Sequence, residues 1–364
     1  MINFKPLFLI SLTSLSLLIT SCGETANQAN QSSELQITNN SNSPAELTEI
    51  NVCYSGVSGT QIVTWYAFEK GLFNKYGLKP NLVSIEGGST ATAAMIAGEM
   101  DFCQIAGPAV VNAVVADQDL VMIAGLFNTY VTSIITNADI KTPEDLKGKA
   151  LAISKPGGAS DTELRKALKY LKLKPDEEVA IISIGEQGER LAAMETGQVV
   201  GTILSPPTTV IAKQKGYQEL LKMSALNLPY QHTSLVTTKE YLQANPQIVE
   251  NFLKAIVEAI YMMKQDQAGT VEVFSKYLLL ELPENEAALN ETYQVLVQEV
   301  LPEMPYPSLE GIQILLTELE TENPQAQNFK PVDVVDTTIL DKLENDGFIG
   351  HKSDPLQTPP QPSP

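Results

Sequence analysis

Two six-residue stretches, AAMIAG at residues 93–98 and AAMETG at residues 192–197, share four residues and lie 99 positions apart. The same offset aligns Pro108 with Pro207 without a gap. Each copy has the pattern of a helix that ends at a glycine, a short strand, and a helix that begins at a proline. Chance similarity in an alanine-rich stretch is the alternative, but the gapless register favours two related α/β lobes.

Strands and helices alternate on both sides of these repeats. The first series has expected strands at 49–54, 80–86, 102–105 and 120–124, and helices at 61–73, 90–97 and 108–116. The second series has strands at 150–154, 179–184 and 200–204, and helices at 161–171, 189–195 and 208–215. Short strands separated by helices of this length predict right-handed βαβ units and a mostly parallel sheet in each lobe.

The pattern changes to helices alone after Thr238. A helix that begins at Asn245-Pro246 carries an apolar face, and further helices are expected at 268–280, 284–300, 308–321 and 336–345. Such helices need a sheet to pack against, so we expect them to return to the first lobe. The first lobe would then be discontinuous, at residues 48–132 plus 234–349, with the second lobe inserted at 133–233.

The amino-terminal residues predict export from the cytoplasm. An apolar run at 7–19 follows Lys5 and ends in Leu18-Ile19-Thr20-Ser21-Cys22. The run is shorter than the roughly 20 apolar residues of a membrane-spanning helix, so residues 1–21 are predicted to be a signal peptide. The ending resembles a bacterial lipobox, which implies that Cys22 is lipid-modified and anchors the mature protein. An ordinary signal peptide with an incidental cysteine is the alternative.

Two polar segments flank the expected folded body. Residues 22–47 are rich in Asn, Ser, Gln and Thr and lack aromatic residues, which predicts a flexible linker between the lipid anchor and the lobes. Residues 350–364 are rich in proline and are expected to be disordered. The chain has 43 acidic and 24 basic residues, only two of them arginines. This charge excludes nucleic acid and anionic lipid surfaces as partners, and we expect a monomer.

Metal, cofactor and catalytic signatures are not found. Cys53 and Cys103 lie in apolar, strand-like segments, where buried free thiols are favoured over a disulfide between neighbouring strands. His232 and His351 are not near a cysteine pair, so no metal site is expected. The sequence also has no Gly-x-Ser-x-Gly nucleophile elbow and no Walker A loop, and we expect neither a cofactor nor catalytic residues.

Loops rich in glycine, serine and proline follow the expected strands of both series. Ligands of open parallel sheets bind beyond the carboxyl ends of the strands, where helix N-termini offer free N–H groups. Helix capping is the alternative for any single loop, but six such loops at the same end favour a binding cleft between the lobes. The candidate ligand-binding residues are Tyr54, Ser55, Ser58, Gly88, Ser89, Gly107, Tyr130, Gly158, Ser160, Asp161, Glu186, Ser205, Pro206 and Tyr230.

The candidate residues also indicate a class of solute. Tyr54, Tyr130 and Tyr230 can form the walls of a cleft, whereas Trp65 is expected in the core. Acidic side chains such as Glu186 either stabilise a helix N-terminus or contact an amino group of a ligand. The tyrosines and acids favour a small organic solute with a ring or an amino group over an inorganic anion.

Several motifs resemble one family of transport proteins in the same order along the chain. They are WYAFEKGLFNKYGL at 65–78, GEMDF at 98–102, TPEDLKGK at 142–149, LSPP at 204–207 and KGY at 215–217. They are similar to those of solute-binding proteins of nitrate/sulfonate/taurine-type ABC importers. That family includes binders of pyrimidine precursors of thiamine, and it shares its fold with a fungal pyrimidine synthase.

The resemblance implies a type II periplasmic-binding fold, in which two Rossmann-like lobes joined by two hinge crossovers close on a small solute. It also implies ABC permease subunits as partners and an extracytoplasmic location at a bacterial membrane. An enzyme of the same fold, related to pyrimidine synthesis or to dehydratases, is one alternative. The export signal and the absence of the synthase's cysteine-rich run argue against it. A sensory or scaffold lipoprotein is the other alternative.

Overall fold

The computed structural model describes residues 47–226 and 228–350. The predicted signal peptide, Cys22, nearly all of the linker and the Pro-rich tail lie outside the described residues. All described residues belong to one compact unit. Within it, no helix is long and apolar enough to cross a membrane.

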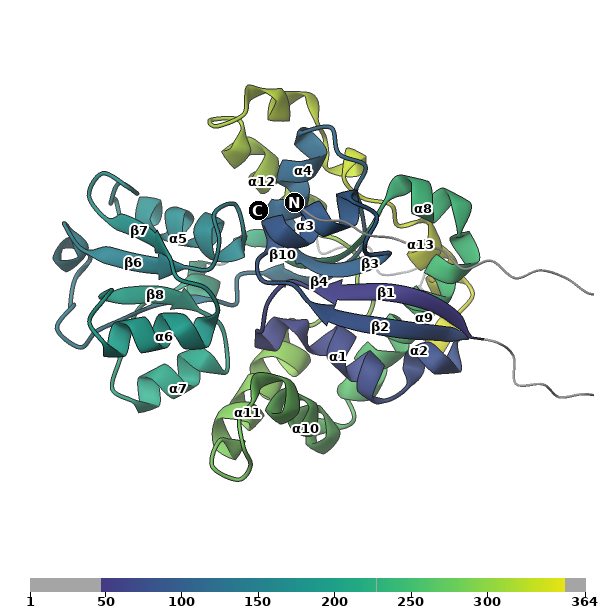
Figure 1. Cartoon of the computed structure of the whole chain (residues 1–364), viewed down its shortest axis with the longest axis horizontal. Helices are drawn as coiled ribbons and strands as arrows, with labels where there is room; N and C mark the ends of the chain where they lie inside the picture. The colour runs from purple at the N-terminus through teal and green to yellow at the C-terminus, as the bar shows by residue number, and fades with distance from the viewer. Residues whose placement is uncertain (1–46, 227, 351–364) are drawn as a thin grey trace, which may run out of the picture. The chain divides into compact units, whose positions relative to one another are not determined.

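The first sheet has five strands in the order β2-β1-β3-β10-β4 (Figure 1). Its strands are β1 (Thr48–Tyr54), β2 (Leu78–Ser84), β3 (Phe102–Ala106), β4 (Val121–Thr129) and β10 (Pro229–Thr237). Strand β1 pairs in parallel with β2 and β3, and β10 runs antiparallel to β3 and β4. The helices between these strands are α1 (Ile62–Glu69), α2 (Leu72–Lys75), α3 (Gly88–Ile96) and α4 (Gly107–Val115).

The second sheet has the order β7-β6-β8-β5-β9. Its strands are β5 (Ser133–Thr136), β6 (Ala150–Ile153), β7 (Ala180–Ser183), β8 (Gly201–Leu204) and β9 (Gln218–Lys222). Strand β5 runs antiparallel to β8 and β9, as β10 does in the first sheet, and β6 pairs in parallel with β7 and β8. Its helices are α5 (Ala159–Tyr170), α6 (Gln187–Glu195) and α7 (Thr208–Gln214).

The sequence repeat corresponds to equivalent parts of the two sheets. The first copy forms α3, β3 and α4, and the second copy forms α6, β8 and α7. Strands β3 and β8 occupy the same position in the strand order of their sheets. The expectation of mostly parallel strands needs one correction, because each sheet contains one antiparallel strand, β10 or β5, which the alternating pattern does not predict.

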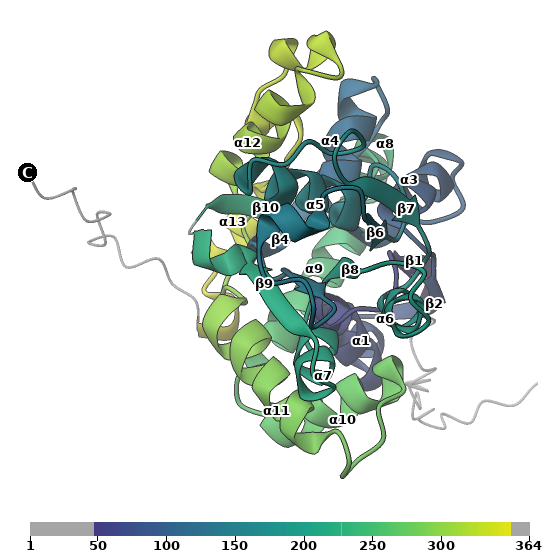
Figure 2. The same ribbon diagram turned by 90° about the vertical axis from the view of Figure 1, so that its left-hand side faces the viewer.

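The carboxyl-terminal helices pack against the first sheet. They are α8 (Lys239–Ala244), α9 (Pro246–Met263), α10 (Gln267–Leu278), α11 (Glu286–Tyr293), which continues as a π-helix (Gln294–Val300), α12 (Leu309–Leu319) and α13 (Thr338–Asn345). Helices α9, α10 and α11 share a core with Val52 and Phe102 on one face of the sheet. Helix α12 shares a core with Ile105 and Val236 on the other face (Figure 2). Apolar side chains on both faces of the first sheet are therefore covered.

The expected helix at 61–73 is two helices. Helix α1 ends at Glu69, and Gly71 adopts a left-handed backbone conformation with φ of 66° before α2 begins. Trp65 is fully buried, as expected, whereas Phe68 on the same helix is 37% exposed. The break redirects the chain, because glycine adopts positive φ at little steric cost.

Cys53 and Cys103 form a disulfide, so the expectation of free thiols is wrong. The parallel pairing of β1 with β3 places the two residues in register, and both side chains are fully buried. The strand order brings them together, which the sequence positions 50 residues apart do not reveal.

Candidate functional site

A small polar cavity lies where the strand-end loops of the two sheets meet. Its volume is about 80 Å³. The first sheet and its loops contribute Ser55, Gly56, Ser58, Thr60, Gln61, Gly87, Gly88, Ala106, His232 and Thr233. The second sheet, its loops and the crossover before it contribute Thr132, Ser154, Ala159, Ser160, Glu186, Gln187, Arg190, Ile203 and Ser205.

Helix N-termini and hydroxyl groups dominate this cavity. Gly88, Ala159 and Gln187 are the first residues of α3, α5 and α6, and each of them lines it. The first N–H groups of a helix lack intrahelical acceptors and carry partial positive charge. With the surrounding serine and threonine hydroxyls, they form a lining rich in hydrogen-bond donors.

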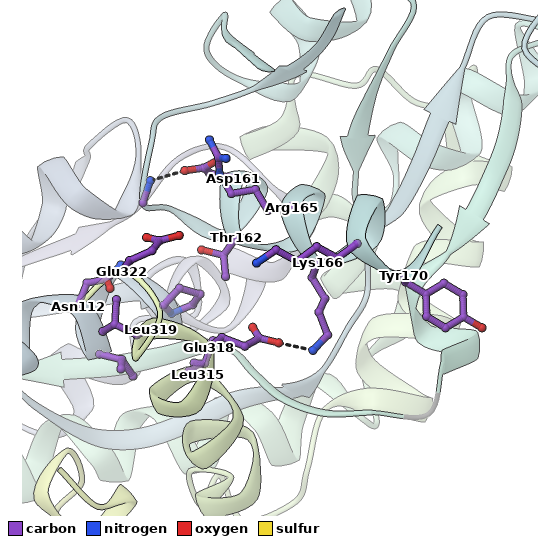
Figure 3. A pocket seen from close by; sticks show the side chains of 14 residues that line it. Asn112, Asp161, Thr162, Arg165, Lys166, Tyr170, Leu315, Glu318, Leu319 and Glu322 are labelled. Carbon is purple, nitrogen blue, oxygen red and sulfur yellow. Dashed lines mark hydrogen bonds and ion pairs between the residues drawn. The ribbon is translucent and has the colours of Figure 1, made fainter. Parts of the chain in front are cut away.

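A larger cavity of about 290 Å³ lies between α4, α5 and α12 (Figure 3). The charged side chains that line it largely pair with one another. Lys166 contacts Glu318, and Arg165 donates to Asp161 across 2.6 Å. We assign the functional site to the smaller cavity, because it lies at the strand ends of both sheets, where α/β folds bind ligands.

Hydrogen bonds connect the loops of the two sheets across the smaller cavity. The N–H of Val57 donates to Oε2 of Glu186 across 3.0 Å. The hydroxyls of Ser58 and Ser205 lie 2.9 Å apart. The N–H of Ser205 also donates to the side-chain oxygen of Gln187, which fixes this loop to the N-terminus of α6.

Arg190 provides a buried positive charge at the cavity. Its Nη1 donates to the carbonyl oxygen of Ile203 across 2.7 Å and to the hydroxyl of Thr202 across 3.2 Å. Burial lowers the pKa of Arg190 to about 10, against the negative charges of Glu186 and Glu163, so the guanidinium stays protonated at neutral pH. Burial also raises the pKa of Glu186, although the N–H of Val57 and the charge of Arg190 oppose this shift.

Three buried polar atoms of lining residues have no hydrogen-bond partner in the described part of the chain. They are Nε of Arg190, Oγ1 of Thr233 and Oε1 of Gln61. Buried polar groups are usually paired, because desolvation without a partner is unfavourable. All three atoms belong to residues of the cavity lining.

His232, Glu163 and Thr132 form a buried cluster beside the cavity. Nδ1 of His232 lies 2.5 Å from Oε1 of Glu163, and the hydroxyl of Thr132 donates to Oε2 of the same carboxylate. Thr132 lies in the crossover between β4 and β5, whereas His232 is on β10 and Glu163 is on α5. The cluster therefore connects both sheets at the side of the cavity.

Six of the fourteen candidate residues line the cavity, and eight do not. The lining residues are Ser55, Ser58, Gly88, Ser160, Glu186 and Ser205. Asp161 lines the larger cavity, and its carboxylate accepts hydrogen bonds from Arg165 and from the N–H of Gly157. The others that do not line the smaller cavity are Tyr54, Ser89, Gly107, Tyr130, Gly158, Pro206 and Tyr230.

The three candidate tyrosines contact other aromatic rings. Tyr54 packs edge-on against Trp65, with ring centroids 5.4 Å apart. Tyr130 and Tyr230 stack on each other at 4.0 Å, and both rings are buried. Their positions are explained by packing, so the aromatic walls that the sequence suggests are not part of the cavity lining.

Several lining residues were not predicted from the sequence. Thr132 lies in the crossover between β4 and β5. His232 and Thr233 lie on β10, a strand that was not predicted. Arg190 is on α6, where the sequence alone gives no sign that its side chain is buried. Gln187 directly follows the candidate residue Glu186, and this neighbour was the available signal for it.

Two mixed α/β sheets with a cavity at their facing strand ends define the periplasmic-binding-protein fold, and this confirms the expected fold class. A protein from Bordetella bronchiseptica RB50 has this arrangement with a TM-score of 0.73 and 19% identity, over 84% of this chain and 99% of that one. The alkanesulfonate-binding protein SsuA from Xanthomonas axonopodis pv. citri matches with a TM-score of 0.65 and 19% identity, over 80% and 99%. The periplasmic nitrate-binding protein NrtA from Synechocystis PCC 6803 matches with a TM-score of 0.64 and 13% identity, over 84% and 90%.

The sequence itself identifies the family. Residues 60–269 match the family described as NMT1/THI5 like. This match covers more than half of the chain, so the protein belongs to that family. No curated protein matches the sequence significantly.

Proposed function

We propose that this protein is an extracytoplasmic solute-binding receptor that captures a small solute between two lobes and delivers it to the permease of an ABC importer. The lobes are residues 48–132 plus 234–349 and residues 133–233. The single observation that carries the proposal is the cavity between the two sheets, with three unpartnered polar atoms in its lining. A solute that contacts loops of both lobes binds the closed form better than the open form, and this difference drives closure.

The location outside the cytoplasm has two independent supports. The predicted signal peptide ends at Cys22, for which we propose lipid modification and anchoring to the membrane. The disulfide between Cys53 and Cys103 is the second support, because such bonds persist in oxidising compartments and are rare in the cytosol. We propose that the lipid anchor attaches a monomeric receptor to the membrane. The described residues contain no helix that could span a membrane.

We propose that the solute is a small molecule, or carries a small polar group, with oxygen atoms that accept hydrogen bonds. The cavity volume of about 80 Å³ is small compared with the roughly 300–1,000 Å³ of sites for drug-sized ligands. Arg190, Thr233 and the N-termini of three helices all offer donors. The tyrosines that favoured a ring-bearing solute do not line the cavity. The structural relatives named for nitrate and alkanesulfonate binding support the same class of solute.

A ligand screen on the purified protein tests the proposal. Melting temperature and radius of gyration are measured with nitrate, bicarbonate, alkanesulfonates, aminopyrimidines and flavins. A true solute at 100 times its Kd stabilises the folded state by about 2.7 kcal/mol, which raises the melting temperature by several degrees, and it reduces the radius of gyration. If no member of the panel changes either quantity, the receptor function is wrong.

Substitutions of two threonines form a matched pair that tests whether the solute binds in this cavity. Thr233 and Thr209 are both buried, and both have an unpartnered Oγ1, but only Thr233 lines the cavity. We expect Thr233→Val to weaken solute binding by roughly threefold to tenfold, because a neutral hydrogen bond contributes about 0.5–1.5 kcal/mol. Thr209→Val should leave the affinity unchanged. Equal effects of the two substitutions would show that the solute binds elsewhere.

A further inference from the structure

Glu163 is a fully buried carboxylate that is held by side chains of other elements of the fold. Its side chain has no exposed surface, and its two oxygens contact Nδ1 of His232 and the hydroxyl of Thr132. A buried carboxylate is stable only with donors at its oxygens. Nδ1 of His232 must therefore carry a proton when Glu163 is ionised.

The proton on Nδ1 leaves Nε2, the other ring nitrogen, as an acceptor or a donor of hydrogen bonds, depending on the protonation state of the ring. Nε2 of His232 has no hydrogen-bond partner among residues 47–226 and 228–350, and His232 lines the cavity. In the neutral ring with Nδ1 protonated, Nε2 is an acceptor, and in the imidazolium both nitrogens are donors. The protonation of His232 thus switches the cavity-facing nitrogen from acceptor to donor.

Other charged and titratable groups surround this pair. Tyr230 packs beside His232 with ring centroids 6.3 Å apart and stacks on Tyr130. Burial raises the pKa of both phenols, and the negative charge of Glu163 raises it further, so both stay neutral. The charged groups near Glu163 and His232 are Arg190 on α6, Glu186 at the N-cap of α6, and Glu318 on α12.

We propose that Glu163 is a positioning residue: its carboxylate accepts from Nδ1–H, fixes the ring of His232 and stabilises the imidazolium, whose Nε2–H donates to an acceptor oxygen of the bound solute. This inference rests on the proposed function and adds a pH-dependent contact to it. The unpartnered Nε–H of Arg190 provides a second donor in the same lining. Glu163 itself does not line the cavity and acts through His232.

The affinity for an oxyanion then depends on pH. When His232 is protonated, Nε2 donates to the oxyanion, and when it is neutral, the lone pair of Nε2 faces the same oxygen. We expect the affinity to fall by about tenfold or more as the pH rises from 5.5 to 8.5, the change expected for loss of one charge-assisted hydrogen bond.

Calorimetric titration with nitrate and with methanesulfonate across this pH range tests the contact. The wild-type protein should bind more tightly at low pH, and His232→Gln should show a flat profile. Glu163→Gln should fold, but it should bind more weakly than the wild-type protein at low pH, because the imidazolium loses the carboxylate that it faces. Glu195→Gln, which removes a carboxylate paired with the half-exposed side chain of Lys215, is the control and should keep the wild-type affinity.

A spectroscopic measurement tests Glu163 without any solute. The chain has two histidines, so His351→Asn leaves His232 as the only imidazole. Nitrogen-15 NMR of this protein at high pH should show Nδ1 protonated and Nε2 unprotonated. The Nε2–H tautomer, or a pH-independent affinity of the wild-type protein, would overturn the proposal.

The two tests also separate this inference from the proposed function. If another solute of the screen binds but neither oxyanion does, the receptor function stands and the contact from His232 to an oxyanion is wrong. If nitrate or methanesulfonate binds equally well to the wild-type protein and to His232→Gln at every pH, the solute class stands and the role of His232 is wrong.

Discussion

Glu186 and Val57 lie 129 residues apart in the chain, yet Oε2 of Glu186 accepts a hydrogen bond from the N–H of Val57 across 3.0 Å. Gly56, directly before Val57, has φ of 94°, and a Cβ at this position would lie 2.8 Å from Oε1 of Glu186. The backbone conformation therefore favours glycine, and a larger residue would displace the carboxylate of Glu186. The contact joins the loop after β1 to the N-terminus of α6, and so joins the two sheets beside the cavity.

The carboxylate of Glu186 should make the stability of the folded protein, in which the loops of the two sheets are in contact, depend on pH. Burial raises its pKa, so the folded protein binds this proton more tightly than the unfolded chain does. The contribution of Glu186 to the stability of the folded state is therefore largest at low pH. This contribution decreases as the pH rises through the raised pKa of Glu186. We expect Glu186→Gln to remove this decrease, so that its melting temperature relative to wild type increases from pH 4 to pH 8. A variant that loses stability relative to wild type as the pH rises would contradict the assignment.

Gly59 should be needed for closure of the two lobes. A Cβ on Gly59 would lie 2.5 Å from the carbonyl oxygen of Pro206, which belongs to the loop after β8. Overpacking of this kind costs about 1–3 kcal/mol, and the lobes can relieve it by moving apart. We expect Gly59→Ala to weaken solute binding by roughly fivefold to 150-fold, as measured by calorimetry, with little change in melting temperature without solute.

The control for Gly59 is Gly188, in the first turn of α6. A Cβ there would meet no atom within 4 Å, so Gly188→Ala should bind solute normally and be slightly more stable, by up to about 1 kcal/mol. X-ray scattering adds a second measurement, in which only Gly59→Ala keeps a large radius of gyration with solute present. Normal contraction of this variant would show that the loops of Gly59 and Pro206 do not meet in the bound state.

The disulfide should contribute substantially to stability. Closing a loop of 50 residues lowers the entropy of the unfolded chain enough to stabilise the fold by about 4 kcal/mol in the chain-entropy treatment. We expect Cys53→Ala combined with Cys103→Ala to lower the free energy of unfolding by up to this amount, as measured by urea denaturation without reductant. Both sulfurs are buried, so the native protein should resist alkylation until it is unfolded and reduced. Rapid alkylation of the native protein without reductant would show that the thiols are free.

Replacement of Cys22 should separate attachment from binding. If Cys22 is the lipid-modified residue, Cys22→Ser should release the protein from the membrane or leave the signal peptide uncut, and the solute affinity should not change. Detergent phase partitioning measures the attachment, and calorimetry on the same preparations measures binding. Loss of both properties together would argue against a tether that is independent of the folded lobes.

The sequence predicted the local elements of the fold well, because their signals are local. The helix expected at 108–116 illustrates this, since α4 (Gly107–Val115) forms there with Pro108 in its first turn. The helix from Asn245-Pro246 also forms, as α9, with its apolar residues buried. The strands β5, β9 and β10 were not predicted. In β10, the polar residues Gln231, His232 and Thr233 interrupt the apolar pattern and are buried only by neighbouring elements.

The cavity was predicted in part. Serine and glycine positions such as Ser58, Ser160 and Gly88 followed from the rule that loops at strand ends bind ligands, and the structure places them in the lining. Arg190, Thr132 and His232 could not be found in this way, because their burial depends on contacts with residues that are distant in sequence. The tyrosine pair shows the converse, because an aromatic residue near a strand end can pack against another ring instead of lining a cavity.

The sequence by itself determined most of the helices, the strands of the two alternating series, the repeat of two α/β units and the loops that are rich in donors, because periodicity, caps and turns depend on neighbouring residues. Only the tertiary structure decided that Cys53 bonds to Cys103, that Glu163 holds His232, and that Glu186 contacts Val57. These pairs depend on strand order, on register and on the approach of the two sheets. Such relationships arise from packing over the whole chain and leave no pattern in any short stretch of it.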